Sequence, residues 1–254
     1  MRIKYYIARF PAVCLFIGLV GNLTAQEKTI IHENQQWLQY YLQLRLSEKW
    51  NVQGDAGYRW KESFSARNQY VLRVGGTYRA TPALQVGGGM AYSGSYGDEG
   101  LEEVEFRPFQ DISLKSDFRY FDLSQRFRME ERFYNPVVDG RISSPNDFNL
   151  RLRYALTANI PLLHFSEKRP AAQLSLQLGD EIFINAGKAI VTDVFDKNRI
   201  VLGPSLQWSK SLTFAFTWSN QFASTAIPDT YRNTQVFWLQ IKQQIDLGNK
   251  KQAL

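Results

Sequence analysis

The sequence has few of the residues that most often bind metals or act as nucleophiles. It contains one cysteine and two histidines in 254 residues. Cys14 lies in an apolar stretch near the N-terminus, and the Pro11-Ala12-Val13 before it is not a lipoprotein signal. A chain without that stretch has no thiol, and therefore neither a disulfide nor a cysteine-based metal site. We expect no metal and no other cofactor.

Long apolar runs and clusters of basic residues are also missing. No apolar run after residue 26 reaches 18 residues, so no transmembrane helix is predicted. The helical spacing of apolar residues is not sustained anywhere. The formal net charge is +6, yet no run of Lys or Arg forms a basic helix face, so nucleic acid is not an expected partner.

The first 26 residues resemble a secretory signal peptide. Arg2, Lys4 and Arg9 give a basic start, residues 11–23 are apolar, and Thr24-Ala25-Gln26 offers small-residue cleavage sites. A short N-terminal anchor helix is the alternative. We expect cleavage, with residues 1–26 removed and residues 27–254 forming one domain. The removed segment carries three of the 30 basic residues and none of the 24 acidic ones, which leaves a mature charge of +3.

What the sequence does have is alternation with a period of two. Residues 148–160 place Phe, Leu, Leu, Tyr, Leu, Ala and Ile at even positions, with mainly polar residues between them. In a strand these two sets face opposite sides. The pattern predicts strands at about 36–46, 50–61, 67–80, 84–96, 103–114, 118–133, 147–161, 171–185, 196–208, 212–222 and 232–247.

These segments match the length of membrane-spanning strands, which need about 9–11 residues. Short connectors at 47–49, 81–83, 115–117 and 209–211, with 162–170 as a longer member of the same set, alternate with the connectors at 97–102, 134–146, 186–195 and 223–231. Short periplasmic turns and long external loops are typical of outer-membrane barrels. The predicted fold is an antiparallel transmembrane β-barrel. Parity favours about twelve strands, with Thr29-Ile30-Ile31-His32 as a short first strand or a segment threaded through the lumen.

Aromatic residues bracket two of the predicted strands. Trp50 and Trp60 share the apolar face of one strand, and Tyr70 and Tyr78 share that of the next. Ten residues span roughly 33 Å along a strand. At a tilt of about 40° this projects to roughly 25 Å, the height of the apolar band between aromatic girdles.

Several segments together resemble an uncharacterised family of outer-membrane barrels, catalogued as domain of unknown function 2490. The resemblance rests on order and spacing across nearly the whole mature chain, and it implies a barrel without an established activity. The segments are Trp37, Lys49-Trp50, Glu105-Phe106-Arg107, Gln125-Arg126-Phe127-Arg128-Met129-Glu130-Glu131-Arg132-Phe133, Arg151-Leu152-Arg153-Tyr154, Glu181-Ile182-Phe183-Ile184-Asn185 and Asn198-Arg199.

The polar face of the predicted barrel is rich in arginine, with fewer acids between. If the apolar face meets lipid, these side chains point into the lumen. The lumen-lining candidates are Glu105, Arg107, Arg126, Arg128, Glu130, Arg132, Arg151, Arg153, Glu181 and Arg199; Arg45, Asp55, Arg59, Arg73, Arg79 and Asp111 share that face. Arginine rings select anions. Alternatively, Arg and Glu fill a narrow barrel by pairing with each other. We expect Glu130 to bridge arginines of its own and the next strand.

Enzyme activity is not expected. A barrel lipase needs Ser and a His base near the bilayer boundary, and neither histidine stands in such a pattern. Gly87-Gly88-Gly89 lacks the lysine and the strand-to-helix context of a phosphate loop, so bends or close packing explain it better. Acidic residues at 98–103 could hold calcium weakly, but a solvated loop is the simpler interpretation.

The leading hypothesis is a small pore or binding barrel for a small, anionic solute in the outer membrane of a Gram-negative bacterium. A structural or interaction barrel with a plugged lumen is the alternative, and a lipid-modifying barrel enzyme is a third. Outer-membrane lipid is the expected partner, and the sequence leaves the oligomeric state undetermined. A soluble barrel of the lipocalin type would show the same alternation turned inside out.

Overall fold

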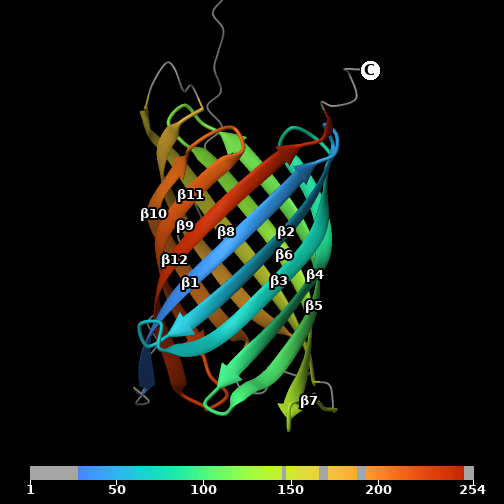
Figure 1. Cartoon of the computed structure of the whole chain (residues 1–254), viewed down its shortest axis with the longest axis vertical. Coiled ribbons are helices and arrows are strands. Elements are labelled where there is room, and N and C mark those ends of the chain that lie inside the picture. Colours follow the sequence, from blue (N-terminus) through green and yellow to red (C-terminus); the bar gives the residue numbers. More distant parts are fainter. Residues whose placement is uncertain (1–27, 145–146, 166–170, 188–192, 249–254) are drawn as a thin grey trace, which may run out of the picture.

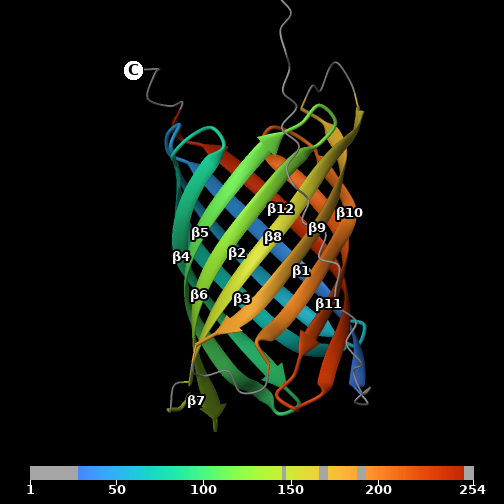
Figure 2. The same cartoon turned by 180° about the vertical axis from the view of Figure 1, so that it is seen from behind.

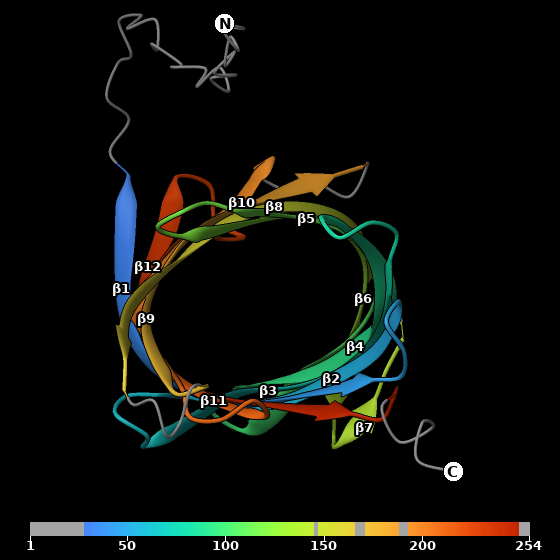
Figure 3. The same ribbon diagram turned by 90° about the horizontal axis from the view of Figure 1, so that it is seen from above.

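The computed structural model describes residues 28–144, 147–165, 171–187 and 193–248. The signal peptide predicted for residues 1–26 lies outside them. In the described part, eleven long strands form a closed barrel, inclined to its axis (Figures 1 and 2). Viewed along the axis, they make a complete ring (Figure 3). No helix among the described residues is long and apolar enough to cross a membrane.

The strands run in sequence around the ring, and each pairs with its neighbours. They are β1 (Thr29–Arg45), β2 (Trp50–Lys61), β3 (Ala66–Arg79), β4 (Leu84–Gly97), β5 (Gly100–Asp117), β6 (Asp122–Val138), β7 (Arg141–Ile142), β8 (Asp147–His164), β9 (Gln173–Ala186), β10 (Phe195–Gln207), β11 (Leu212–Ser224) and β12 (Thr230–Asp246). All eleven predicted segments are strands. The two-residue β7 is an extra element that pairs only with the end of β6.

The barrel closes differently from the prediction. β1 and β12 pair in parallel over their full lengths, from Thr29 opposite Thr230 to Arg45 opposite Asp246. The expected twelfth strand is wrong, because Thr29–His32 is the start of β1 itself. No glycine or proline between His32 and Trp37 allows a turn there. An odd number of alternating strands leaves the first and last parallel, and their pairing satisfies both edges.

The connectors at one end share a turn with a hydroxyl residue. Ser47, Thr81 and Ser209 each accept hydrogen bonds, through the side-chain oxygen, from backbone N–H groups two and three residues on. Serine and threonine favour such turns for this reason. The end that carries these turns is called the upper end here, because it lies at the top of Figure 1.

The expected contrast between short and long connectors is weaker than predicted. The lower connector between β4 and β5 is reduced to residues 98–99, because both strands extend into the expected loop. The upper connector expected at 115–117 is displaced to 118–121 because β5 continues to Asp117. Loop length therefore does not orient the barrel.

The outer wall of the barrel is apolar and the inner wall is polar. Leu72, Val74 and Met90 are among the outward residues, each half-exposed. Inward neighbours such as Gln39, Glu130 and Gln240 are almost fully buried. This arrangement is the reverse of a soluble barrel, whose apolar residues fill the interior.

Aromatic side chains lie on the outer wall near both ends. Trp50 contacts Tyr78 near the upper end, with ring centroids 4.9 Å apart. The two tryptophans of β2 lie on the outer wall at opposite ends of that strand, as the spacing predicted. The lower group includes Tyr58, Trp60, Phe64, Tyr70, Tyr92, Tyr96, Phe106, Phe133, Phe148, Phe222 and Tyr231, and the upper group Trp50, Tyr78, Phe118, Tyr120, Phe121, Phe165 and Trp208.

Glycines allow a close approach between β3 and β4. Gly75 lies opposite Gly89, and a Cβ at Gly89 would stand 2.2 Å from the Val74 carbonyl oxygen and 2.8 Å from the Phe109 ring. Bends or close packing were the expected roles of the glycine run, and the geometry of Gly89 supports close packing.

We expect Gly89→Ala to destabilise the barrel by about 1–3 kcal/mol, because the added methyl group forces backbone to shift. Gly76→Ala is the matched control, since the nearest atom to its added Cβ is the Asn51 carbonyl oxygen at 3.8 Å. Urea unfolding of the refolded barrel, followed by tryptophan fluorescence, measures both. Equal midpoints for the two variants would contradict the close-packing explanation.

Candidate functional site

The ten candidate residues all lie on the inner wall. They come from five consecutive members of the ring: β5, β6, β8, β9 and β10. The period-two spacing places them there, because the outward set on the same strands is apolar. The structure brings most of them into one connected network of ion pairs.

Glu130 is the centre of this network and has no exposed surface. Its carboxylate accepts hydrogen bonds from Arg151 at 2.5 Å and from Arg153 at 2.5 Å, both on the neighbouring strand β8. Arg107 of β5 and Arg128 of its own strand lie 3.7 and 3.9 Å away. The expected bridging role of Glu130 is therefore confirmed by the contacts.

Other inward acids pair with these arginines and with their neighbours on the inner wall. Asp111 binds Arg128 with two bonds of 2.6 Å. Glu181 accepts from Arg153 at 2.6 Å and from Arg126 at 2.7 Å, with Arg199 at 3.7 Å. Three further ion pairs complete the set: Glu105 binds Arg107 and Arg132, and Asp196 binds Arg151. Bidentate pairs of this kind fix the side chains firmly.

Glu130 also belongs to a layer of buried side chains near mid-height in the lumen, which we call the waist. Each residue of this layer is 5 % exposed or less. Around the ring the waist consists of Trp37, Val71, Ala91, Phe109, Glu130, Phe183, Thr217 and Val236. Side chains also fill small natural barrels in this way.

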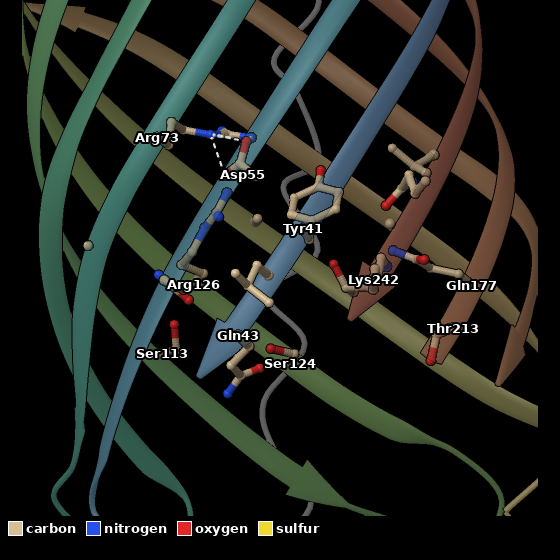
Figure 4. A pocket seen from close by; sticks show the side chains of 18 of the residues that line it. Tyr41, Gln43, Asp55, Arg73, Ser113, Ser124, Arg126, Gln177, Thr213 and Lys242 are labelled. Atoms are coloured by element: carbon tan, nitrogen blue, oxygen red, sulfur yellow. Dashed lines mark hydrogen bonds and ion pairs between the residues drawn. The ribbon is translucent and has the colours of Figure 1, made fainter. Parts of the chain in front are cut away.

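Above the waist lies a cavity of about 650 Å³, which we call the cup (Figure 4). Tyr41 of β1, the Asp55–Arg73 pair and Arg126 project into it, as does Lys242 of β12. Hydroxyl and amide side chains line much of the rest: Gln43, Gln53, Ser113, Ser124, Thr157, Gln177, Gln207, Thr213 and Gln240.

The cup has more positive than negative side chains. Its lining includes six Arg or Lys residues of the inner wall, of which Lys242 has no ion pair among the described residues. Inward carboxylates in the lining are Asp55 and Glu181, and both are already paired with arginine. The electrostatic field in the cup therefore favours anions.

Sequence reasoning missed most of the cup. Tyr41, Gln43, Gln177 and Lys242 were not singled out, although the same alternation places them on the inner wall. The sequence pattern drew attention to the arginines of the ion-pair network because they lie close together on neighbouring strands, as Arg128 and Arg153 do. Arg45 and Arg79, also expected inside, lie at the upper rim, and Arg45 pairs with Asp246 at 3.4 Å.

The two histidines lie at opposite ends of the barrel. His32 lies at the lower end of β1 and His164 at the upper end of β8, and both are exposed. Among the described residues no group of three or more His, Cys, Asp or Glu is placed to hold a metal ion. The acidic residues at 98–103 belong to that described part.

Comparison with protein families found one match, which covers residues 34–232. The description of that family is "Protein of unknown function (DUF2490)". Comparisons with curated proteins and with solved structures found no match. The match extends from β1 into β12 and includes the whole waist except Val236, and the chain therefore belongs to the DUF2490 family.

Proposed function

We propose that this protein is an outer-membrane β-barrel that binds a small, hydroxylated anion in the cup. The observation that carries the proposal is the cup itself: a polar, net-positive cavity open toward one end and closed by the waist. Its volume lies within the range of about 300–1,000 Å³ typical of small-molecule sites.

The outer wall supports the membrane part of the proposal. Half-exposed Leu, Val, Ile, Met and Phe side chains surround the barrel between the two aromatic groups. A continuous apolar band is unfavourable in water, and soluble proteins therefore rarely expose apolar patches larger than a few hundred Å². An apolar band flanked by aromatic girdles matches the lipid-facing wall of outer-membrane barrels.

The waist favours binding over passage. Passage of a solute through the lumen would require Glu130, Phe183 and Val236 to move apart. Each of these side chains is almost fully buried, so such a movement is unfavourable. The filled waist also favours the second candidate, a structural barrel with a plugged lumen. The two candidates differ in what they predict for the cup. A binding barrel uses Lys242, which has no ion pair among the described residues, to attract an anion, whereas a purely structural barrel binds no ligand there.

The location is tested by fractionation. We expect the natural protein to sediment with outer membranes, and the folded form to migrate differently on gels before and after boiling. Full recovery in the soluble periplasmic fraction would refute the membrane proposal.

Binding is tested with glucuronate and glucose, two probes of similar size that differ in charge. We expect the refolded barrel to bind glucuronate in calorimetric titrations and to bind glucose more weakly. Lys242→Gln should weaken glucuronate binding about tenfold, the equivalent of one lost charge-assisted contact.

Lys49→Gln, in an upper turn outside the cup, is the matched control and should bind like the wild type. Equal affinity for both sugars would refute the preference for anions, and no binding of either would favour the structural barrel. Planar-bilayer recordings complete the comparison: a steady open conductance would show that the waist opens.

A further inference from the structure

Below the cup, where β1 and β12 meet, two tryptophans and two arginines pack together. We call Trp37, Trp238, Arg59 and Arg199 the floor cluster. The tryptophan rings meet edge to face, with centroids 5.2 Å apart. The Arg59 guanidinium lies 3.9 Å from the Trp37 ring, and that of Arg199 lies 5.4 Å from Trp37 and 6.0 Å from Trp238.

Three nitrogen donors of this cluster are buried without an acceptor. Arg59 Nε, Arg199 Nε and Trp238 Nε1 have no hydrogen-bond partner among the described residues. By contrast, Trp37 Nε1 donates to Gln35 at 2.9 Å. A buried donor without an acceptor is costly, and three in one cluster call for an acceptor that the described chain does not supply.

The cluster also lacks negative charge. Arg59 donates to the neutral Gln69 side chain, and no ion pair involves it among the described residues. The nearest charge in the cluster is that of Arg199, since both guanidinium groups lie over the Trp37 ring, at 3.9 and 5.4 Å. Among the described residues Arg199 forms one ion pair, with Glu181 at 3.7 Å, and Arg153 and Arg126 bind that carboxylate more closely. It also donates to the neutral Gln221 side chain, at 3.3 Å. Adjacent buried cations repel strongly unless an anion lies between them.

The cluster is reached from the cup. Arg199, Trp238 and Tyr41 all line the cavity, and Tyr41 projects into it (Figure 4). A ligand in the cup therefore lies next to Arg199 and Trp238, two of the three residues whose donors have no acceptor among the described residues.

We propose that the floor cluster is an anion site, in which Arg59, Arg199 and Trp238 bind one small monoanion, either a halide or a carboxylate. Two guanidinium charges offset in part by Glu181 match one negative charge better than two, which disfavours phosphate. The proposal deepens the proposed function, because the carboxylate of the cup's solute would occupy this site.

Iodide is a direct probe, because it quenches indole fluorescence on contact. In the refolded, full-length mature barrel we expect a saturable component of quenching that chloride and acetate compete away. Trp238→Phe should reduce this component to the part that Trp37 contributes. Arg59→Gln and Arg199→Gln should each raise the half-saturating iodide concentration at least tenfold.

Arg232→Gln is the matched control, since it removes a cation from β12 at the lower rim, where Arg232 pairs with Glu33. It should leave the saturable component unchanged. The gel shift on boiling verifies that each variant folds. If an Arg→Gln variant fails to fold, Arg59→Lys, which keeps the charge but lacks the Nε–H donor, replaces it and should also weaken iodide binding.

Purely collisional, non-saturating quenching in the wild type would overturn the anion site, as would saturation that survives loss of Arg59. The experiments test the floor site separately from glucuronate binding in the cup. Glucuronate binding without saturable iodide quenching would refute the floor site and leave the proposed function standing. Saturable iodide quenching that glucuronate does not compete away would support the floor site but show that the solute does not occupy it.

Discussion

Glu130→Gln is expected to destabilise the barrel by about 3–5 kcal/mol, the usual cost of removing one partner of a buried ion pair. Glu130 has no exposed surface, and four guanidinium groups lie within 3.9 Å of its oxygens. A neutral amide leaves their mutual repulsion uncompensated and presents an N–H₂ donor to groups that are themselves donors.

The loss should fall toward the lower end of that range, because each arginine keeps a second carboxylate. Arg151 retains Asp196, Arg153 retains Glu181, and Arg128 retains Asp111. Arg107 likewise retains Glu105. The network should therefore weaken without coming apart, and the variant should still fold.

Urea unfolding in lipid bilayers measures the change. Glu131→Gln is the matched control: it makes the same substitution one residue along β6, where the side chain points outward. We expect its effect to stay within about 0.5 kcal/mol, as for ordinary surface changes. A loss at Glu130 no larger than that at Glu131 would show that the waist does not depend on this carboxylate.

Leu72→Arg is expected to cost about 2–4 kcal/mol in a bilayer, the penalty measured for Arg on the lipid-facing wall near the midplane. Leu72 lies at the centre of β3, is 50 % exposed and sits between Ala56 and Tyr92 on the outer wall. A guanidinium there has no carboxylate within its register and must be desolvated by lipid.

Leu72→Gln separates the charge from the loss of leucine and should cost clearly less than Leu72→Arg. The measurement is reversible unfolding in bilayers whose thickness matches the apolar band. If both variants are equally stable and close to wild type, the outer wall at β3 faces water or a protein partner, and the membrane proposal fails there.

The alternation of side chains was sufficient to predict which segments are strands. In segment 148–160 apolar residues alternate with residues that are mostly polar. In β8 the apolar residues lie on the outer wall and the others on the inner wall. Periodicity is a local property of the chain, so it needs no knowledge of distant contacts. The same local logic placed the arginines of β6 and β8 on one wall and identified Glu130 as their bridge.

How the barrel closes was decided only by the tertiary structure. Glu33, Asn34, Gln35 and Gln36 interrupt the apolar alternation, so the pattern predicted a strand from residue 36, whereas β1 begins at Thr29. The parallel register with β12 joins residues about 200 positions apart, and no local pattern encodes such a pairing. Strand count and parity therefore depended on a long-range contact.

The division of the lumen into a filled waist and an open cup was likewise decided by the tertiary structure. Alternation assigns both Arg153 and Lys242 to the inner wall, but it says nothing about their heights or their partners. Carboxylates of β5, β6 and β9 bind the arginines of the network, whereas Lys242 of β12 lies beside Tyr41 of β1 and forms no ion pair with any described residue. The sequence by itself determined the two faces of each strand, because side-chain direction follows backbone geometry. Only the tertiary structure decided which charges are neutralised and which remain available to a ligand, because that depends on distances between strands that are far apart in the chain.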